Sequence, residues 1–251
     1  MLENKKVIIF DLDGTLIDSV GMWNGVDSKL IAALGGTPDD EDAIGRRRDR
    51  LLEAFCAQPD PYLAYCAQLG KDAGADASPE EIKRLRYRIA NDCLKTAVRP
   101  KPGAAALLCT LTQMGKTLAL ASTTSRANVD IYMHQNEHIR AQMDFSALFS
   151  CIFTRDDVDE IKPSPKMHHL VMQTLGVSPK DCLVVEDSLA GVLAAEAAGI
   201  AVWAVYDRFA QKDQAAICAR ADHYFASCTA MLDFVKGAQT SPPTLDNNQS
   251  E

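Results

Sequence analysis

Two aspartates stand close together near the start of the chain, directly after a short apolar run. The run Val7–Phe10 has the composition of a strand that is buried on both faces, and it leads into Asp11, Asp13 and Gly14. Two like charges at the end of a buried strand destabilise each other unless a cation lies between them. A divalent metal ion with oxygen ligands is the simplest such cation. We therefore interpret Asp11 and Asp13 as the centre of a reaction site.

Three further groups of polar residues follow later apolar runs that resemble strands. They are Ser122, Thr123 and Thr124 after 117–121, Lys162 in the loop after 150–154, and Glu186 and Asp187 after 182–185. Each group alone has an ordinary explanation, since strand-end serines and acidic residues often cap helices and a lysine between prolines often lies in a rigid surface loop. Because the carboxyl ends of parallel strands share one edge of a sheet, where ligands bind, the groups together indicate one site.

The residue types of this set suit the transfer of a phosphoryl group. Such a transfer depends on positioning and on stabilising negative charge, which a carboxylate nucleophile, a magnesium ion, hydroxyl and N–H donors and a fixed ammonium group supply. One metal ion together with Lys162 would also compensate the four acidic side chains. The partner that this chemistry predicts is a small-molecule phosphate ester.

Strands and helices alternate around these residues. The predicted strands are 7–10, 117–121, 150–154, 182–185 and 201–205. The predicted helices between the later strands are 104–114, 125–142, 165–175 and 189–198. This alternation predicts an α/β fold with a doubly wound, Rossmann-like parallel sheet and helices on both of its faces.

Residues 18–97 interrupt this alternation, because they carry only helical patterns, in about four helices. We therefore predict an α/β catalytic core with an inserted all-helical cap domain. The predicted boundaries are 1–17 and 98–236 for the core, 18–97 for the cap, and 237–251 for a disordered tail that is too polar to bury apolar surface.

Composition limits the function classes. The net charge is −8, and basic and acidic residues are interspersed, which argues against binding to nucleic acid or to a membrane surface. The polar start and the short apolar run after it predict neither a signal peptide nor a membrane span. The eight cysteines form no CxxC pair and lack zinc spacing, so we interpret them as buried free thiols of a cytoplasmic protein. No pattern predicts the oligomeric state.

The polar groups resemble the four motifs of the haloacid dehalogenase superfamily of aspartate-nucleophile phosphotransferases. The matching stretches are Phe10–Leu16, Ser122, Lys162–Pro165, and Glu186–Ser188 with Ala190 and Gly191. The helical insert resembles the cap of the subgroup that holds phosphoglycolate phosphatase and beta-phosphoglucomutase. The resemblance thus covers the whole predicted core and the insert.

The resemblance implies a role for each motif residue. Asp11 is expected to attack phosphorus and become an aspartyl-phosphate, while Asp13 protonates the leaving oxygen and then activates water. Ser122 and Lys162 are expected to bind the phosphoryl oxygens, and Thr123 and Thr124 are neighbouring candidates for substrate binding. The expected magnesium ligands are Asp11, the backbone carbonyl of Asp13, and Asp187, with Glu186 in or near the coordination shell.

Two residues of the predicted cap are candidate substrate contacts. Gly45–Arg48 resembles a cap stretch of the subgroup in which an arginine contacts the substrate, so Arg48 is a candidate anion contact, although a solvated helix charge explains it as well. Trp23 either lines the substrate cleft or fixes the cap helix. It stands where the mutase of this subgroup carries a histidine, which favours a phosphatase.

The predicted function is a magnesium-dependent phosphatase that hydrolyses a small phosphorylated metabolite, such as a sugar phosphate or a phosphoglycolate-like compound. Asp13 favours phosphate chemistry, because the metal-free dehalogenases of the superfamily lack this second aspartate. Two alternatives stay open. One is a sugar-phosphate mutase of the beta-phosphoglucomutase type, and the other is a non-catalytic phosphate-binding regulatory protein.

Overall fold

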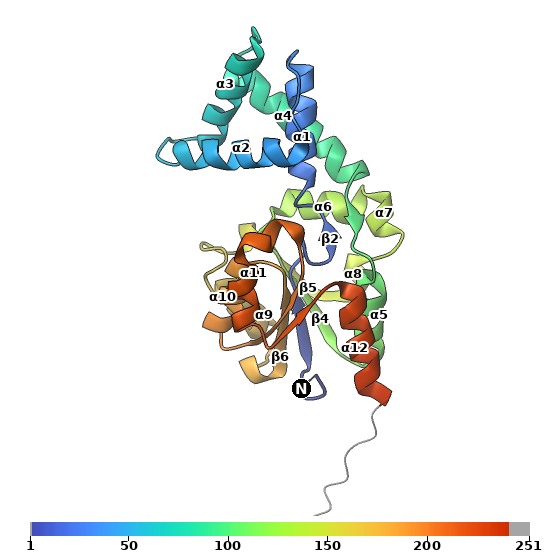
Figure 1. Ribbon diagram of the computed structural model, residues 1–251. Helices are drawn as coiled ribbons and strands as arrows, with labels where there is room; N and C mark the ends of the chain where they lie inside the picture. The colour runs from blue at the N-terminus through green and yellow to red at the C-terminus, as the bar shows by residue number, and fades with distance from the viewer. Residues whose placement is uncertain (1, 241–251) are drawn as a thin grey trace, which may run out of the picture. The chain divides into compact units, whose positions relative to one another are not determined.

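The computed structural model describes residues 2–240, and it divides into two compact units (Figure 1). The first unit contains Lys101–Thr124 together with the segments that precede Ile17 and follow Asp144. The second unit contains Ile17–Pro100 and Ser125–Asp144. We describe each unit by itself.

Within the described residues, the first unit contains one six-stranded sheet in which every pair of neighbouring strands is parallel. Its strands are β1 (Val7–Phe10), β4 (Thr117–Ala121), β5 (Phe149–Phe153), β6 (Cys182–Glu186), β7 (Ala201–Val205) and β8 (His223–Phe225). Their order in the sheet is β5-β4-β1-β6-β7-β8. The predicted parallel α/β fold is therefore confirmed.

The strand order reverses direction beside β1. From β1 the chain builds outward through β4 to β5, and it then returns to place β6 on the other side of β1 and continues to β7 and β8. Phe10 pairs with Val185, so the carboxyl ends of β1 and β6 lie next to each other. In open α/β sheets this reversal point is where ligands bind.

Helices cover both faces of the sheet (Figure 1). The helices of the first unit are α5 (Ala104–Gln113), α8 (Phe145–Leu148), α9 (Lys166–Leu175), α10 (Leu189–Ala197), α11 (Gln214–Arg220) and α12 (Cys228–Thr240). Helices α9, α10 and α11 lie on one side, and α5 and α12, which contact each other, lie on the other. Strands β1, β4, β6 and β7 are buried on both faces, and their sequences are continuous apolar runs for that reason.

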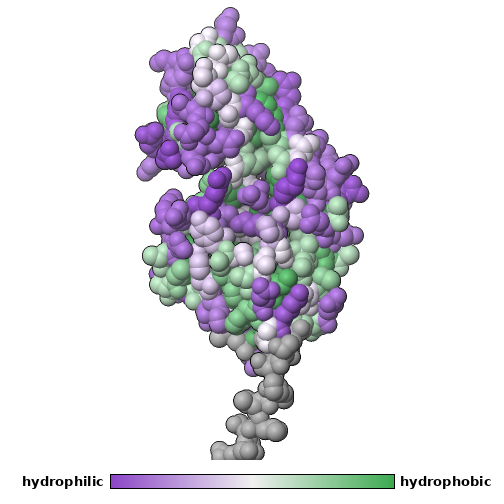
Figure 2. Space-filling view, turned by 45° about the vertical axis from the view of Figure 1, so that its right-hand side comes forward, coloured by the Kyte–Doolittle hydropathy of each residue, from purple (hydrophilic) through white to green (hydrophobic). Residues whose placement is uncertain are grey.

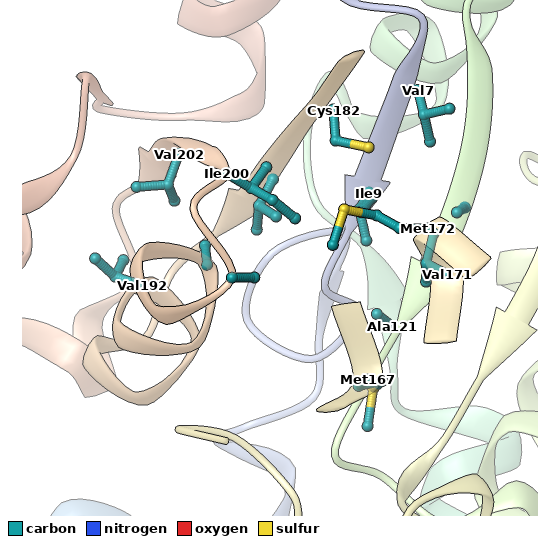
Figure 3. Close-up of a cluster of buried hydrophobic side chains, with 14 of the residues drawn as sticks. Val7, Ile9, Ala121, Met167, Val171, Met172, Cys182, Val192, Ile200 and Val202 are labelled. Atoms are coloured by element: carbon teal, nitrogen blue, oxygen red, sulfur yellow. The ribbon is translucent and has the colours of Figure 1, made fainter. Parts of the chain in front are cut away.

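One core cluster shows how a sheet face and its helices pack (Figure 3). Alternate strand residues such as Val7 and Ile9 point to the same face, because side chains alternate along a strand. Met167 and Val171 of α9 and Val192 of α10 belong to the same cluster and cover this face of the sheet. This packing holds the loops at the carboxyl ends of the strands on a rigid base.

The second unit is mainly helical, which confirms the predicted helical insert. Its helices are α1 (Met22–Ala33), α2 (Glu41–Ala54), α3 (Pro61–Ala73), α4 (Pro79–Thr96), α6 (Arg126–His134) and α7 (Glu137–Arg140). A short antiparallel pair, β2 (Ile17–Asp18) and β3 (Arg99–Pro100), joins the two ends of the insert. Ser78 and Glu81 form a capping box at the start of α4, as the sequence pattern indicates.

The predicted single helix at 125–142 was wrong in detail, because the chain breaks at Asn136 into α6 and α7. The side chain of Asn136 is buried, accepts the N–H of Ile139 at 3.0 Å, and donates to the carbonyls of Leu94 and Val98. An asparagine in this position starts a new helix. These residues group with the helical insert, whereas we predicted them in the core; the two domain boundaries stay a prediction.

The structure contains helices and a strand after β7 that we did not predict from the sequence. A 3₁₀ turn at Arg208–Asp213, α11, β8 and α12 all lie in this region. Helix α12 continues to Thr240, so the first four residues of the tail predicted at 237–251 are helical, and the rest of that tail lies outside the described residues.

The cysteines and the surface complete the description. All eight thiols are free, but Cys56, Cys109 and Cys218 are exposed, so the prediction that the cysteines are buried holds only for part of them. Figure 2 shows hydrophilic and hydrophobic residues interspersed on the visible face, an arrangement typical of protein surfaces. Among residues 2–240, no helix combines the length and apolar composition that crossing a membrane requires.

Candidate active site

Three carboxylates from distant parts of the chain meet at the reversal point of the sheet. Asp11 follows β1, Glu186 ends β6, and Asp187 follows it. One oxygen from each lies within 4.8 Å of the others, and all three residues are buried. The backbone N–H of Asp11 donates to the Val185 carbonyl at 3.0 Å, which continues the β1–β6 ladder into the site. The sheet register therefore brings these carboxylates together.

Lys162 is the cation that the chain itself provides. Its Nζ donates to Asp11 Oδ1 at 2.7 Å and to Glu186 Oε1 at 2.6 Å, and the residue is only 6% exposed. Burial works to lower the pKa of its ammonium group, but the charges of Asp11 and Glu186 outweigh burial and hold this pKa above its usual value. The lysine thus stays charged between two carboxylates.

One ammonium group does not compensate three buried carboxylates. Burial raises the pKa of Asp11 to about 8, with Lys162 opposing the rise and Glu186 adding to it. Burial also raises the pKa of Asp187 well above its usual value, and the charges of Glu186 and Asp11 add to that rise. A divalent cation with a preference for oxygen ligands would relieve this repulsion, so the donor set fits Mg²⁺.

Two glycines make room for the carboxylates. Gly14 has φ = +86°, and a Cβ added there would lie 2.3 Å from Asp187 Oδ2. A Cβ at Gly191, in the first turn of α10, would lie 1.8 Å from Glu186 Oε1. No side chain fits at either position. The resemblance includes both glycines, but only the structure shows which carboxylate each one accommodates.

Glu186 is held more completely than the other two carboxylates. Its Oε1 accepts from Lys162, while its Oε2 accepts from the backbone N–H groups of Asp187 and Ser188 and from the Ser188 hydroxyl, each at 2.9 Å. Both oxygens are therefore engaged by the chain. Glu186 orients Lys162 and the start of α10 in addition to any part it takes in holding a cation.

Asp13 and Ser122 meet beside this cluster. The Ser122 hydroxyl donates to Asp13 Oδ2 at 3.3 Å and accepts the backbone N–H of Thr124 at 3.1 Å. Ser122 is buried, while Thr123 and Thr124 are half-buried. The side chain of Asp13 is not part of the three-carboxylate cluster, and the resemblance assigns only its backbone carbonyl to the metal. The assigned roles of these residues stay predictions.

The candidate substrate contacts Trp23 and Arg48 belong to the second unit and lie around a buried aspartate there. Arg48 Nη1 donates to Asp27 Oδ2 at 3.3 Å, and Arg86 donates to the same carboxylate through Nε at 2.6 Å and Nη2 at 3.3 Å. The guanidinium carbon of Arg86 lies 5.0 Å from the centre of the Trp23 ring. Arg48 is thus partly engaged by Asp27, and its role toward a substrate stays a prediction.

Sequence reasoning gave no role to Thr15, which contacts the cluster. The Thr15 hydroxyl donates to Asp187 Oδ1 at 2.9 Å, although the two residues are 172 positions apart. Thr15 lies inside the first motif, so its position was visible in the sequence. Its partner was not, because only the packing of the loop after β1 against β6 brings them together.

Comparisons with known proteins agree with this geometry. A family model described as haloacid dehalogenase-like hydrolase matches residues 5–199. The bifunctional riboflavin kinase/FMN phosphatase of Arabidopsis thaliana is 31% identical over 198 residues, which are 79% of this chain and 48% of that protein, so the chain spans about half of that relative's length. Protein CbbY of Rhodobacter capsulatus is 30% identical over 199 residues, which are 78% of this chain and 83% of CbbY.

A solved structure is similar over both chains. CbbY from Rhodobacter sphaeroides, crystallised in complex with phosphate, has a TM-score of 0.64 and 26% identity, with 90% of this chain and 96% of that chain covered. A mutant of the same protein was crystallised with xylulose-(1,5)bisphosphate. The likeness thus extends across the sheet and the helical insert.

Proposed function

We propose that this chain, which belongs to the haloacid dehalogenase-like hydrolase family, is a Mg²⁺-dependent phosphatase of a small phosphorylated metabolite. Family membership confirms the resemblance and the predicted class, a hydrolase. The observation that carries the proposal is the buried cluster of Asp11, Glu186 and Asp187 with Lys162 between two of its members. This set has a nucleophile, a cation site and a fixed positive charge within contact distance.

Asp11 is the nucleophile of the proposed reaction. Its carboxylate attacks phosphorus, the ester P–O bond breaks, and an aspartyl-phosphate forms on Asp11. Asp13 gives its proton to the leaving oxygen, so the alcohol leaves neutral. Asp13 then takes a proton from water as that water attacks the phosphorus, which releases inorganic phosphate and restores the Asp11 carboxylate. No redox partner is needed.

The neighbouring groups hold the phosphoryl oxygens. Lys162 stays charged beside Asp11 and offsets the negative charge that the phosphoryl group brings. Ser122 offers a hydroxyl next to Asp13, and Thr123 offers a backbone N–H group and Thr124 a hydroxyl in the loop after β4. Bound Mg²⁺ would supply further positive charge, held by Asp11, Asp187 and the carbonyl of Asp13.

The proposed substrate class is a sugar phosphate or a similar small metabolite. Support comes from CbbY, which was crystallised with phosphate and with xylulose-(1,5)bisphosphate and is similar to this chain over both units. The composition agrees, since the chain has a net charge of −8, which disfavours a polyanionic partner such as nucleic acid.

The test is phosphate release from p-nitrophenyl phosphate and from a panel of phosphorylated metabolites. We expect Mg²⁺-dependent release by the wild type and a loss of at least about 10³-fold in kcat in Asp11→Asn, because an amide is a poor nucleophile. Glu196→Gln is the matched control, since Glu196 is an acidic residue on the surface of α10 that pairs with Arg220. Full activity of Asp11→Asn would rule out Asp11 as the nucleophile.

The same panel separates the alternatives. Isomerised sugar phosphate with little free phosphate would indicate a mutase. Binding of Mg²⁺ and phosphate without turnover of any compound would indicate a regulatory protein.

A further inference from the structure

A second buried ion pair lies at the same edge of the sheet, outside the residues that the sequence predicted for the site. Asp207 follows β7 and is 5% exposed. Its Oδ2 lies 2.6 Å from Lys101 Nζ, and its Oδ1 accepts the backbone N–H of Phe209 at 2.8 Å. Both oxygens are therefore engaged within the chain, and Asp207 is not a member of the three-carboxylate cluster.

The backbone of Lys101 fastens the loop that carries Asp13 and Gly14. Its N–H donates to the Leu16 carbonyl at 2.9 Å, and the N–H of Leu16 donates to the Leu12 carbonyl at 2.9 Å, which closes the loop 12–16 on itself. Lys101 is thus attached through its backbone to the loop and through its side chain to the end of β7.

The same loop is attached to the cation site through Thr15. Its hydroxyl donates to Asp187 Oδ1 at 2.9 Å, and its carbonyl accepts the buried thiol of Cys228 at 3.3 Å. A chain of contacts therefore runs from Asp187 through Thr15 and Leu16 to Lys101.

The register of the sheet places the pair beside the acidic cluster. Glu186 pairs with Ala204 in the β6–β7 ladder, and Asp207 follows β7, so Asp207 lies at the carboxyl end of the strand next to the one that carries Glu186 and Asp187. Lys101 contacts Asp207 there, so both charges lie near the acidic cluster at the carboxyl edge of the sheet.

We propose that Lys101 and Asp207 are positioning residues that set the affinity of the acidic cluster for a divalent cation. The backbone of Lys101 holds the loop 12–16 against Asp187, and its ammonium group balances the charge of Asp207 beside the cluster. Neither residue touches the cation. The inference rests on the proposed function, which assigns Mg²⁺ to this cluster.

The test is calorimetric titration with Mg²⁺ alone, without substrate, on the full chain. Asp207→Asn leaves the charge of Lys101 uncompensated near the site, and we expect it to weaken Mg²⁺ binding about three- to tenfold. Lys101→Met keeps the backbone bond to Leu16 and leaves the charge of Asp207 uncompensated, so it should strengthen binding by about the same factor. The double variant should return close to the wild-type affinity.

Two further variants serve as a control and as a replacement in the Mg²⁺ titration. Lys6 Nζ lies 2.9 Å from Asp181 Oδ1 at the opposite, amino-terminal edge of the sheet, so Lys6→Met is the matched control and should leave Mg²⁺ affinity unchanged. Lys101→Gln removes the same charge as Lys101→Met but keeps a donor for Asp207. It should shift the affinity in the same direction, and it replaces Lys101→Met if that variant does not fold.

Opposite shifts from the two single variants support the inference, because a purely structural pair would not separate by the sign of the charge removed. Shifts in the same direction, or a lower melting temperature with unchanged Mg²⁺ affinity, would overturn it. A wild type that fails to bind Mg²⁺ would contradict the proposed function and this inference together, whereas a binding wild type with unshifted variants contradicts this inference alone.

Discussion

Lys162 and His168 show what burial does to single residues near the site. Lys162 keeps its charge because two carboxylates contact it. His168, six residues later, is 1% exposed, and neither ring nitrogen has a hydrogen-bond partner among the described residues. Burial, aided by the charges of Lys162 and His169, lowers the pKa of His168 to about 3. The buried imidazole is therefore neutral throughout the physiological range.

This neutral imidazole makes stability depend on pH. The unfolded chain takes up a proton on His168 near pH 6.5, whereas the folded chain does so only near pH 3, so the free energy of unfolding falls as the pH drops through this window. We expect His168→Leu to be at least as stable as the wild type at pH 7, and to lose about 2 kcal/mol less than the wild type on going from pH 7 to pH 5. Urea unfolding at both pH values measures this.

The exposed neighbour is the control for this prediction. His169→Gln should follow the wild type at both pH values, since His169 lies on the surface of the same helix. Equal losses of stability in His168→Leu and in the wild type would show that His168 is protonated in the folded chain.

At the scale of elements, the strands that hold the site were predictable, whereas the edge strand β8 was not. β1, β4, β6 and β7 are continuous apolar runs, because helices cover both faces of the sheet. β8 has three residues, and two of them are half-buried, so it leaves no such pattern.

The conformation at the start of α10 depends on a single small residue. Gly191 lies in its first turn, where an added Cβ would lie 1.8 Å from Glu186 Oε1. We expect Gly191→Ala to lower the free energy of unfolding by about 1–3 kcal/mol, because the carboxylate must move. Activity should fall as well, since Glu186 holds Lys162. Urea unfolding and phosphate release measure the two effects.

A second helical glycine separates this effect from helix propensity. Gly237 lies in α12, and an added Cβ there meets nothing within 4 Å. Gly237→Ala should therefore be neutral or stabilising, by up to about 1 kcal/mol. If Gly191→Ala were also neutral, the close approach to Glu186 would not constrain the site.

At the scale of the whole molecule, the sheet order decides which distant residues meet. Asp11 and Asp187 come together because β1 and β6 are neighbours, and a rule about parallel strand ends was enough to predict this from the sequence. The same rule does not give partners for individual side chains. The contact of Thr15 with Asp187 and the pair of Lys101 with Asp207 depend on how loops pack, which composition and spacing do not encode.

In the proposed reaction, Asp11 carries the phosphoryl group during turnover. The most direct measurement is to quench the Mg²⁺-loaded protein with acid during turnover of p-nitrophenyl phosphate, reduce it with borohydride, and map its peptides by mass spectrometry. An aspartyl-phosphate is reduced to homoserine, so we expect homoserine at Asp11 and an unchanged Asp13. Phosphate release without modification of Asp11, or with modification at another residue, would contradict it.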